Sequence, residues 1–132
     1  MVPDHPHCRG DPPPAELTED VDTVRAMYQA LEEEDARVLS CILDPRVVWV
    51  DPLVSRLPFD GVCRGLPSVL RAAFRRGAYG TGPRLSAGAF LEMGDGVLVA
   101  GRFLTDNGAG EPFLHECFVK DGRVARVCGY PA

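Results

Sequence analysis

The chain has 132 residues, of which 45% are hydrophobic and 25% charged, with a formal net charge of -5. This length fits one domain that buries its own core. The acidic balance argues against nucleic acid and against an anionic membrane surface as partners, because both favour basic proteins. No apolar stretch approaches the 18 residues that would indicate a transmembrane helix.

Five cysteines stand at positions 8, 41, 63, 117 and 128, and no two of them have CxxC spacing. A disulfide framework or a structural zinc site would require paired, closely spaced ligands, so we expect neither. Most of these cysteines lie among apolar residues, where a free thiol packs as a small hydrophobic group. A reducing, cytoplasmic location is therefore predicted.

Five of the first 16 residues are proline, which predicts a disordered leader over 1–17 and one folded domain over 18–132. His5, His7 and Cys8 in this leader lack the fixed surroundings of a metal site. Two helices should follow. The first begins near Thr18 and carries an apolar stripe with helical spacing, and the second ends at Pro45, because the residue before proline avoids the helical region.

A strand is predicted over 46–52 from its β-branched and aromatic residues, with Val47, Trp49 and Asp51 on one face. A loop or short hairpin and a third helix, from about Pro67 to Arg76, come next. Four more strands are expected, over 83–93, 96–105, 112–120 and 123–130, separated by Gly and Asp-Gly sequences typical of tight turns. Short turns between successive strands indicate an antiparallel sheet, and helices must cover one of its faces.

Four of these segments, in this order, resemble the SnoaL-like and ketosteroid-isomerase-like members of the nuclear transport factor 2-like (NTF2-like) superfamily. They are residues 28–31, 47–52, 61–65 and 115–124. The resemblance covers about residues 18–130. It implies an α+β fold with a cone-shaped, curved antiparallel sheet packed against three helices around a central pocket.

The resemblance also implies roles for particular residues. Asp51 matches the general base of the ketosteroid isomerases, and His115 falls where those isomerases place a protonated aspartate of the oxyanion hole. Their oxyanion-hole tyrosine falls at Met27, one position before Tyr28. With two of these three groups changed, the pattern is closer to SnoaL-like proteins, in which an aspartate and a histidine share the pocket.

Each candidate has a plainer alternative. Asp51 is expected to be a general base in apolar surroundings, or else a turn residue that faces water. His115 should share a strand face with Phe113 and Cys117 and transfer protons, or else be a buried, satisfied histidine. Tyr28 either orients a ligand or fills the core. The residues expected to line the ligand site, or simply to pack, are Trp49, Val47, Phe59, Phe74, Phe103 and Cys117.

The sequence has no phosphate-binding loop, HExxH or GxSxG motif, so no cofactor or metal is expected. We predict a cofactor-independent enzyme that acts by acid/base chemistry on a small apolar, polyketide-like molecule, as an isomerase, a cyclase, or a hydratase or epoxide hydrolase. The alternative is a non-catalytic module that binds a hydrophobic ligand or serves in dimerisation. In either case a homodimer through the outer face of the sheet is expected.

Overall fold

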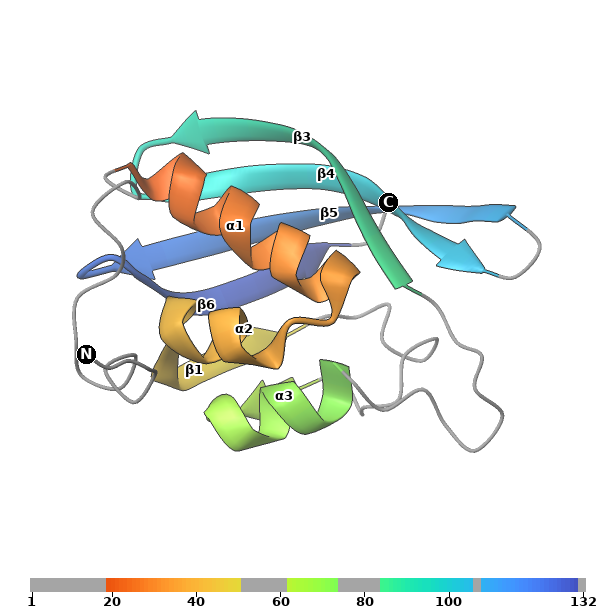
Figure 1. The fold of residues 1–132 in the computed structure, drawn as a ribbon. Coiled ribbons are helices and arrows are strands. Elements are labelled where there is room, and N and C mark those ends of the chain that lie inside the picture. Colours follow the sequence, from red (N-terminus) through yellow and green to blue (C-terminus); the bar gives the residue numbers. More distant parts are fainter. Residues whose placement is uncertain (1–18, 51–61, 74–83, 106–107, 131–132) are drawn as a thin grey trace.

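The computed structural model describes residues 19–50, 62–73, 84–105 and 108–130 (Figure 1). The predicted leader, residues 1–17, lies outside this part of the chain. The elements are α1 (Asp20–Glu33), α2 (Ala36–Ile42), β1 (Leu43–Val50), β2 (Val62–Arg64), α3 (Leu66–Ala73), β3 (Arg84–Met93), β4 (Gly96–Thr105), β5 (Gly108–Lys120) and β6 (Arg123–Tyr130). No helix in these ranges is long and apolar enough to cross a membrane.

The junction between α1 and α2 is defined by its capping residues. Glu34 ends α1 in the left-handed conformation, with φ 58° and ψ 42°. Asp35 follows as the N-cap of α2, and its carboxylate accepts a hydrogen bond from the Val38 amide at 3.1 Å. Such a cap satisfies an amide that the first helical turn leaves unpaired. The two helices therefore meet at a sharp, well-defined corner.

The predicted end of α2 at Pro45 is wrong. The helix ends at Ile42 and the strand begins at once, so that Pro45 lies inside β1. Proline is tolerated here because the pairing of β1 with β6 shifts register between Leu43 and Val48, and proline is accommodated in strands at such irregularities. Of the two alternatives after β1, the structure contains the hairpin partner, since β2 pairs antiparallel with β1.

One sheet contains all six strands, in the order β2-β1-β6-β5-β4-β3. The four strands from β3 to β6 form the predicted meander of antiparallel neighbours. The expectation of a wholly antiparallel sheet is wrong for β1 and β6, which run parallel. These strands are far apart in the sequence, so no tight turn dictates their relative direction. The sheet is therefore mixed.

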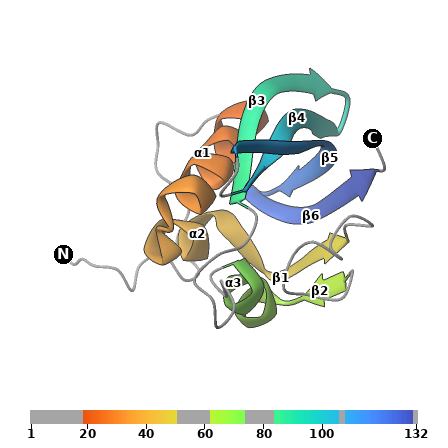
Figure 2. The same cartoon turned by 90° about the vertical axis from the view of Figure 1, so that its right-hand side faces the viewer.

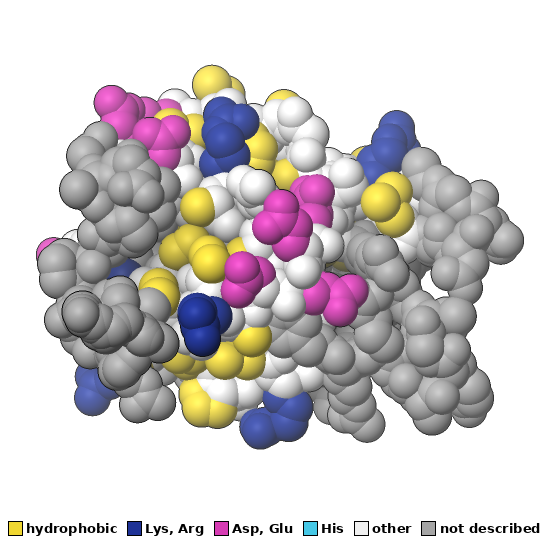
Figure 3. Space-filling model, viewed as in Figure 1, with side chains coloured by type: hydrophobic (Ala, Val, Ile, Leu, Met, Phe, Trp, Pro, Cys, Tyr) yellow, Lys and Arg dark blue, Asp and Glu magenta, His cyan; other side chains and the backbone are white. Residues whose placement is uncertain are grey.

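The sheet curls around α1, which lies across its concave face, while α2 and α3 lie against β1 at the other end (Figures 1 and 2). The pairing of β3 with β4 shifts register between Ala87 and Ala89. The pairing of β4 with β5 shifts register between Arg102 and Leu104. Such bulges bend strands and increase their twist. The helical face carries acidic side chains over both ends of α1 (Figure 3).

Alternating residues of the strands face the core between sheet and helices. On β1 the buried residues are Leu43, Val47 and Trp49, and on β5 they include Phe113, His115 and Cys117. The predicted alternation is thus confirmed for Val47 and Trp49 and on β5, whereas Asp51 lies outside the described residues. The other side of β5, with Leu114, Glu116 and Phe118, is only half-buried. His115 consequently lies inside the domain with no exposed surface.

Candidate functional site

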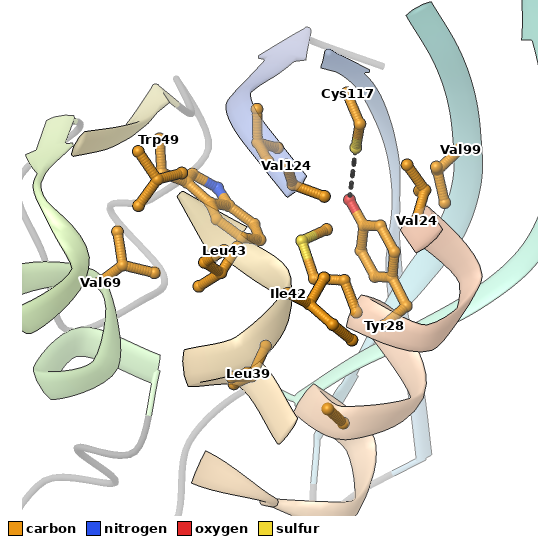
Figure 4. Close-up of a cluster of buried hydrophobic side chains, with 14 of the residues drawn as sticks. Val24, Tyr28, Leu39, Ile42, Leu43, Trp49, Val69, Val99, Cys117 and Val124 are labelled. Carbon is orange, nitrogen blue, oxygen red and sulfur yellow. Dashed lines mark hydrogen bonds between the residues drawn. The ribbon is translucent and has the colours of Figure 1, made fainter. Parts of the chain in front are cut away.

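The candidate site is centred on His115, which β5 presents to the concave face and α1 covers. The Tyr28 hydroxyl of α1 lies 2.5 Å from Nδ1 of His115. The same hydroxyl lies 3.6 Å from the Cys117 sulfur, an interaction drawn in Figure 4. Thus Tyr28, and not its neighbour Met27, is the residue of α1 whose side chain contacts position 115 with a phenol.

Aromatic rings surround His115 on several sides. The ring centroid of Phe113 lies 4.4 Å from that of His115, and Trp49 lies at 5.6 Å with its ring nearly perpendicular, at 87°. Phe103 packs on Phe113 with a centroid distance of 5.4 Å. Trp49 on β1 and Tyr28 on α1 lie on opposite sides of the cluster of buried hydrophobic side chains in Figure 4. Among the described residues, the imidazole therefore lies against aromatic rings, with the Tyr28 hydroxyl as a polar contact.

Burial fixes the protonation state of the neighbouring thiol. It raises the pKa of Cys117 to about 12, although the hydrogen bond with Tyr28 acts in the opposite direction. The thiol is therefore protonated at neutral pH and can donate to the Tyr28 oxygen. With that orientation the Tyr28 proton can be donated to Nδ1 of His115.

This thiol makes stability depend on alkaline pH. Unfolding lowers the pKa of Cys117 from about 12 towards the ordinary 9.0, so between these values the unfolded chain releases a proton that the folded chain keeps. We expect the free energy of unfolding to fall with pH in this window, by at most about 1.4 kcal/mol per unit. Urea titrations from pH 8 to 11, without a reductant so that the Cys41 disulfide stays intact, would measure it. Cys117→Ala should remove this part of the slope and Cys128→Ala should keep it, while equal slopes in all three proteins would contradict the assignment.

The structure brings together six of the nine predicted site residues. His115, Tyr28, Trp49, Phe103 and Cys117 are buried in the contacts given above, and Val47 is buried on the face of β1 that carries Trp49. The other three, Asp51, Phe59 and Phe74, lie outside the described residues. The catalytic and ligand-binding roles of all nine remain predictions.

Strand alternation predicts that Phe113 shares a face with His115, but Phe113 is not among the predicted lining residues, and its ring centroid lies 4.4 Å from that of His115. The feature that the sequence did not reveal is the Trp49 indole nitrogen. Among the described residues it is the single buried side-chain nitrogen or oxygen with no hydrogen-bond partner. No sequence pattern marks such an atom.

The cysteines differ from one another. Cys63, Cys117 and Cys128 form no disulfide, whereas Cys41 is disulfide-bonded. The expectation of unpaired cysteines is therefore wrong at Cys41, because bridging depends on distance in space and not on CxxC spacing. Within the described ranges, no three His, Cys, Asp or Glu side chains are grouped so as to hold a metal ion.

Comparison with solved structures identifies the fold. An NTF2-like protein of unknown function from Burkholderia pseudomallei superposes with a TM-score of 0.64 at 27% sequence identity, over 83% of this chain and 88% of the other. The chain has the NTF2-like fold. No protein-family model and no curated protein sequence matches it.

Other proteins with this fold carry names that bear on chemistry. A Sinorhizobium meliloti protein provisionally assigned as a polyketide cyclase matches with a TM-score of 0.67 at 20% identity, over 83% of this chain and 94% of the other. A Kribbella flavida protein provisionally assigned as a ketosteroid isomerase matches with a TM-score of 0.68 at 18% identity, over 89% and 79%. At these identities the matches show the shared fold alone, and they confirm the expected α+β architecture.

Proposed function

We propose that this protein is a cofactor-independent enzyme that performs acid/base chemistry on a small, largely apolar molecule. The observation that carries the proposal is the wholly buried His115, held at Nδ1 by the Tyr28 hydroxyl and surrounded by aromatic rings. A histidine can take up and release protons near neutral pH. A core that needed only packing would be served by an apolar residue at this position, because burying a polar group costs free energy.

The proposal gives each polar group a role. His115 relays a proton or stabilises developing charge, and Tyr28 holds the imidazole in one orientation. Asp51 directly follows β1, two residues after Trp49, and is proposed as the general base from the sequence resemblance. The reaction class is isomerisation or cyclisation, since removal of a proton next to a carbonyl begins both. The names of the polyketide cyclase and ketosteroid isomerase neighbours support this class.

Deuterium exchange into an aromatic ketone tests the proposal without knowledge of the natural substrate. In D2O, the base would remove a C1 proton from 2-tetralone, the electron pair would move to oxygen as an enolate, and the exchanged base would return a deuteron to C1. NMR would follow loss of the C1 proton signal. We expect wild type to exceed the buffer rate, and Asp51→Asn to lose at least about 100-fold of this acceleration.

The matched control is Asp95→Asn, which removes a carboxylate in the exposed turn between β3 and β4 and should leave the rate unchanged. If bound 2-tetralone exchanges no faster than in buffer, the enzyme proposal fails. Binding whose affinity is indifferent to pH between about 5 and 8 would then favour the alternative, a non-catalytic module for a hydrophobic ligand.

A second copy of this chain is the proposed protein partner. The outer sheet face carries exposed Leu91, Met93 and Tyr130 beside half-buried Leu114 and Phe118, and apolar patches of this kind mark interaction sites. We expect sedimentation equilibrium to give the dimer mass and Leu91→Lys with Met93→Lys to shift it towards the monomer. A monomeric wild-type protein at micromolar concentration would contradict the proposed dimer.

The cytoplasmic location stays a prediction.

A further inference from the structure

Trp49 holds a polar atom that the fold itself does not use. Its side chain is 4% exposed, and its indole nitrogen has no hydrogen-bond partner. Buried polar groups in native proteins almost always have a partner, and leaving a donor unpaired costs free energy because its hydration is lost. An unpaired, buried N–H is therefore a reason to look for a ligand atom or a water molecule that satisfies it.

The position of Trp49 indicates which kind of ligand atom would satisfy its indole nitrogen. The indole packs perpendicular to the imidazole of His115 at a centroid distance of 5.6 Å. Its neighbours on the same face are apolar, with Val47 two residues before it on β1 and Cys63 opposite it on β2. An indole nitrogen donates and never accepts a hydrogen bond. The atom that satisfies it must therefore be an acceptor, next to the group proposed to transfer protons.

We propose that the indole N–H of Trp49 binds an acceptor oxygen of the ligand. The ligand is then an apolar, ring-containing molecule that carries a carbonyl or phenolate oxygen, and not a pure hydrocarbon. The oxygen is anchored by Trp49 while the adjoining carbon atoms lie near His115. This inference deepens the proposed function, on which it rests for the location of the site, and it makes Trp49 a binding residue in addition to a wall of the core.

The chain has one tryptophan, which permits an isosteric test. In a tryptophan-auxotrophic host, β-(3-benzothienyl)alanine would replace Trp49 alone, with a sulfur atom in place of the N–H. Equilibrium dialysis would compare 2-tetralone with tetralin, which has CH2 in place of the carbonyl. We expect the isostere to bind 2-tetralone about tenfold more weakly than wild type, and tetralin within about twofold, as the loss of one hydrogen bond implies. Trp49→Phe should show the same difference if the isostere is not incorporated.

Any other result of the binding comparison overturns the inference about Trp49. Equal changes for the two ligands would show that Trp49 only packs, and unchanged binding of both would leave the N–H to a buried water. Failure of wild type to bind either compound up to its solubility would exclude this ligand class. A tenfold effect on 2-tetralone binding without any deuterium exchange would keep the inference and reject the proposed enzyme activity, so the two can fail separately.

Discussion

Replacing His115 by glutamine is expected to lower deuterium incorporation into 2-tetralone by about 100-fold or more, the range contributed by a general acid or base. The glutamine side chain can still form a hydrogen bond with the Tyr28 hydroxyl, which lies 2.5 Å from Nδ1 in the native protein. It cannot gain or lose a proton near neutral pH. The variant therefore separates proton transfer from simple hydrogen bonding at this position.

Tyr28→Phe provides the matched second variant, because it keeps the ring that stacks on Phe113 at 6.1 Å and removes only the hydroxyl. We expect a smaller loss of rate, about tenfold, from an imidazole that is less well held. Near-UV circular dichroism would establish that both variants are folded, with His115→Asn as a replacement if the glutamine is not accommodated. A His115→Gln rate within threefold of wild type would show that the histidine only packs.

Gly101→Ala is expected to destabilise the protein by about 3 kcal/mol, at the upper end of the usual range for overpacking. A Cβ atom at this position would lie 2.2 Å from the Ser86 carbonyl oxygen and 2.6 Å from Cζ of Phe113. The first contact is with the backbone of β3, which moves only if the strand pairing moves. The second is with the ring that packs on His115, so the substitution should also disturb the candidate site.

Gly88→Ala is the control for this substitution. Gly88 also lies in a strand of the meander, but among the described residues a Cβ atom there would meet only the Ala100 carbonyl oxygen, at 3.5 Å, an ordinary contact. Urea unfolding should place this variant within about 1 kcal/mol of wild type. If Gly101→Ala is equally well tolerated, the close packing of β3, β4 and Phe113 is not as described.

Local patterns were sufficient to predict most of the secondary structure. The Asp121-Gly122 turn is an example, since both residues have positive φ, 54° and 79°, as a two-residue hairpin turn of this kind requires. Alternation placed His115 on the core side of β5 because flanking residues on that face are apolar. These signals lie within a few residues of one another, which is why the sequence alone revealed them.

Contacts between distant segments were not predictable in this way. The parallel pairing of β1 with β6 joins strands that no short turn connects. The hydrogen bond between Tyr28 and His115 spans 87 positions. The resemblance to the isomerases predicts the tyrosine position at Met27, one residue before Tyr28. Gly101 carries no special backbone angle, and the explanation for it is the close approach of the Ser86 carbonyl oxygen and of the Phe113 ring. Such features depend on three-dimensional packing.

The most direct test of the central claim is a crystal structure of the protein with 2-tetralone bound. We expect the ketone to lie against Trp49 and Phe113, with a reacting atom or its oxygen within about 3.5 Å of His115. If the ketone binds only on the outer face of the sheet, or if His115 is closed off by packed side chains in the bound protein, His115 is a structural residue and the proposed chemistry is excluded.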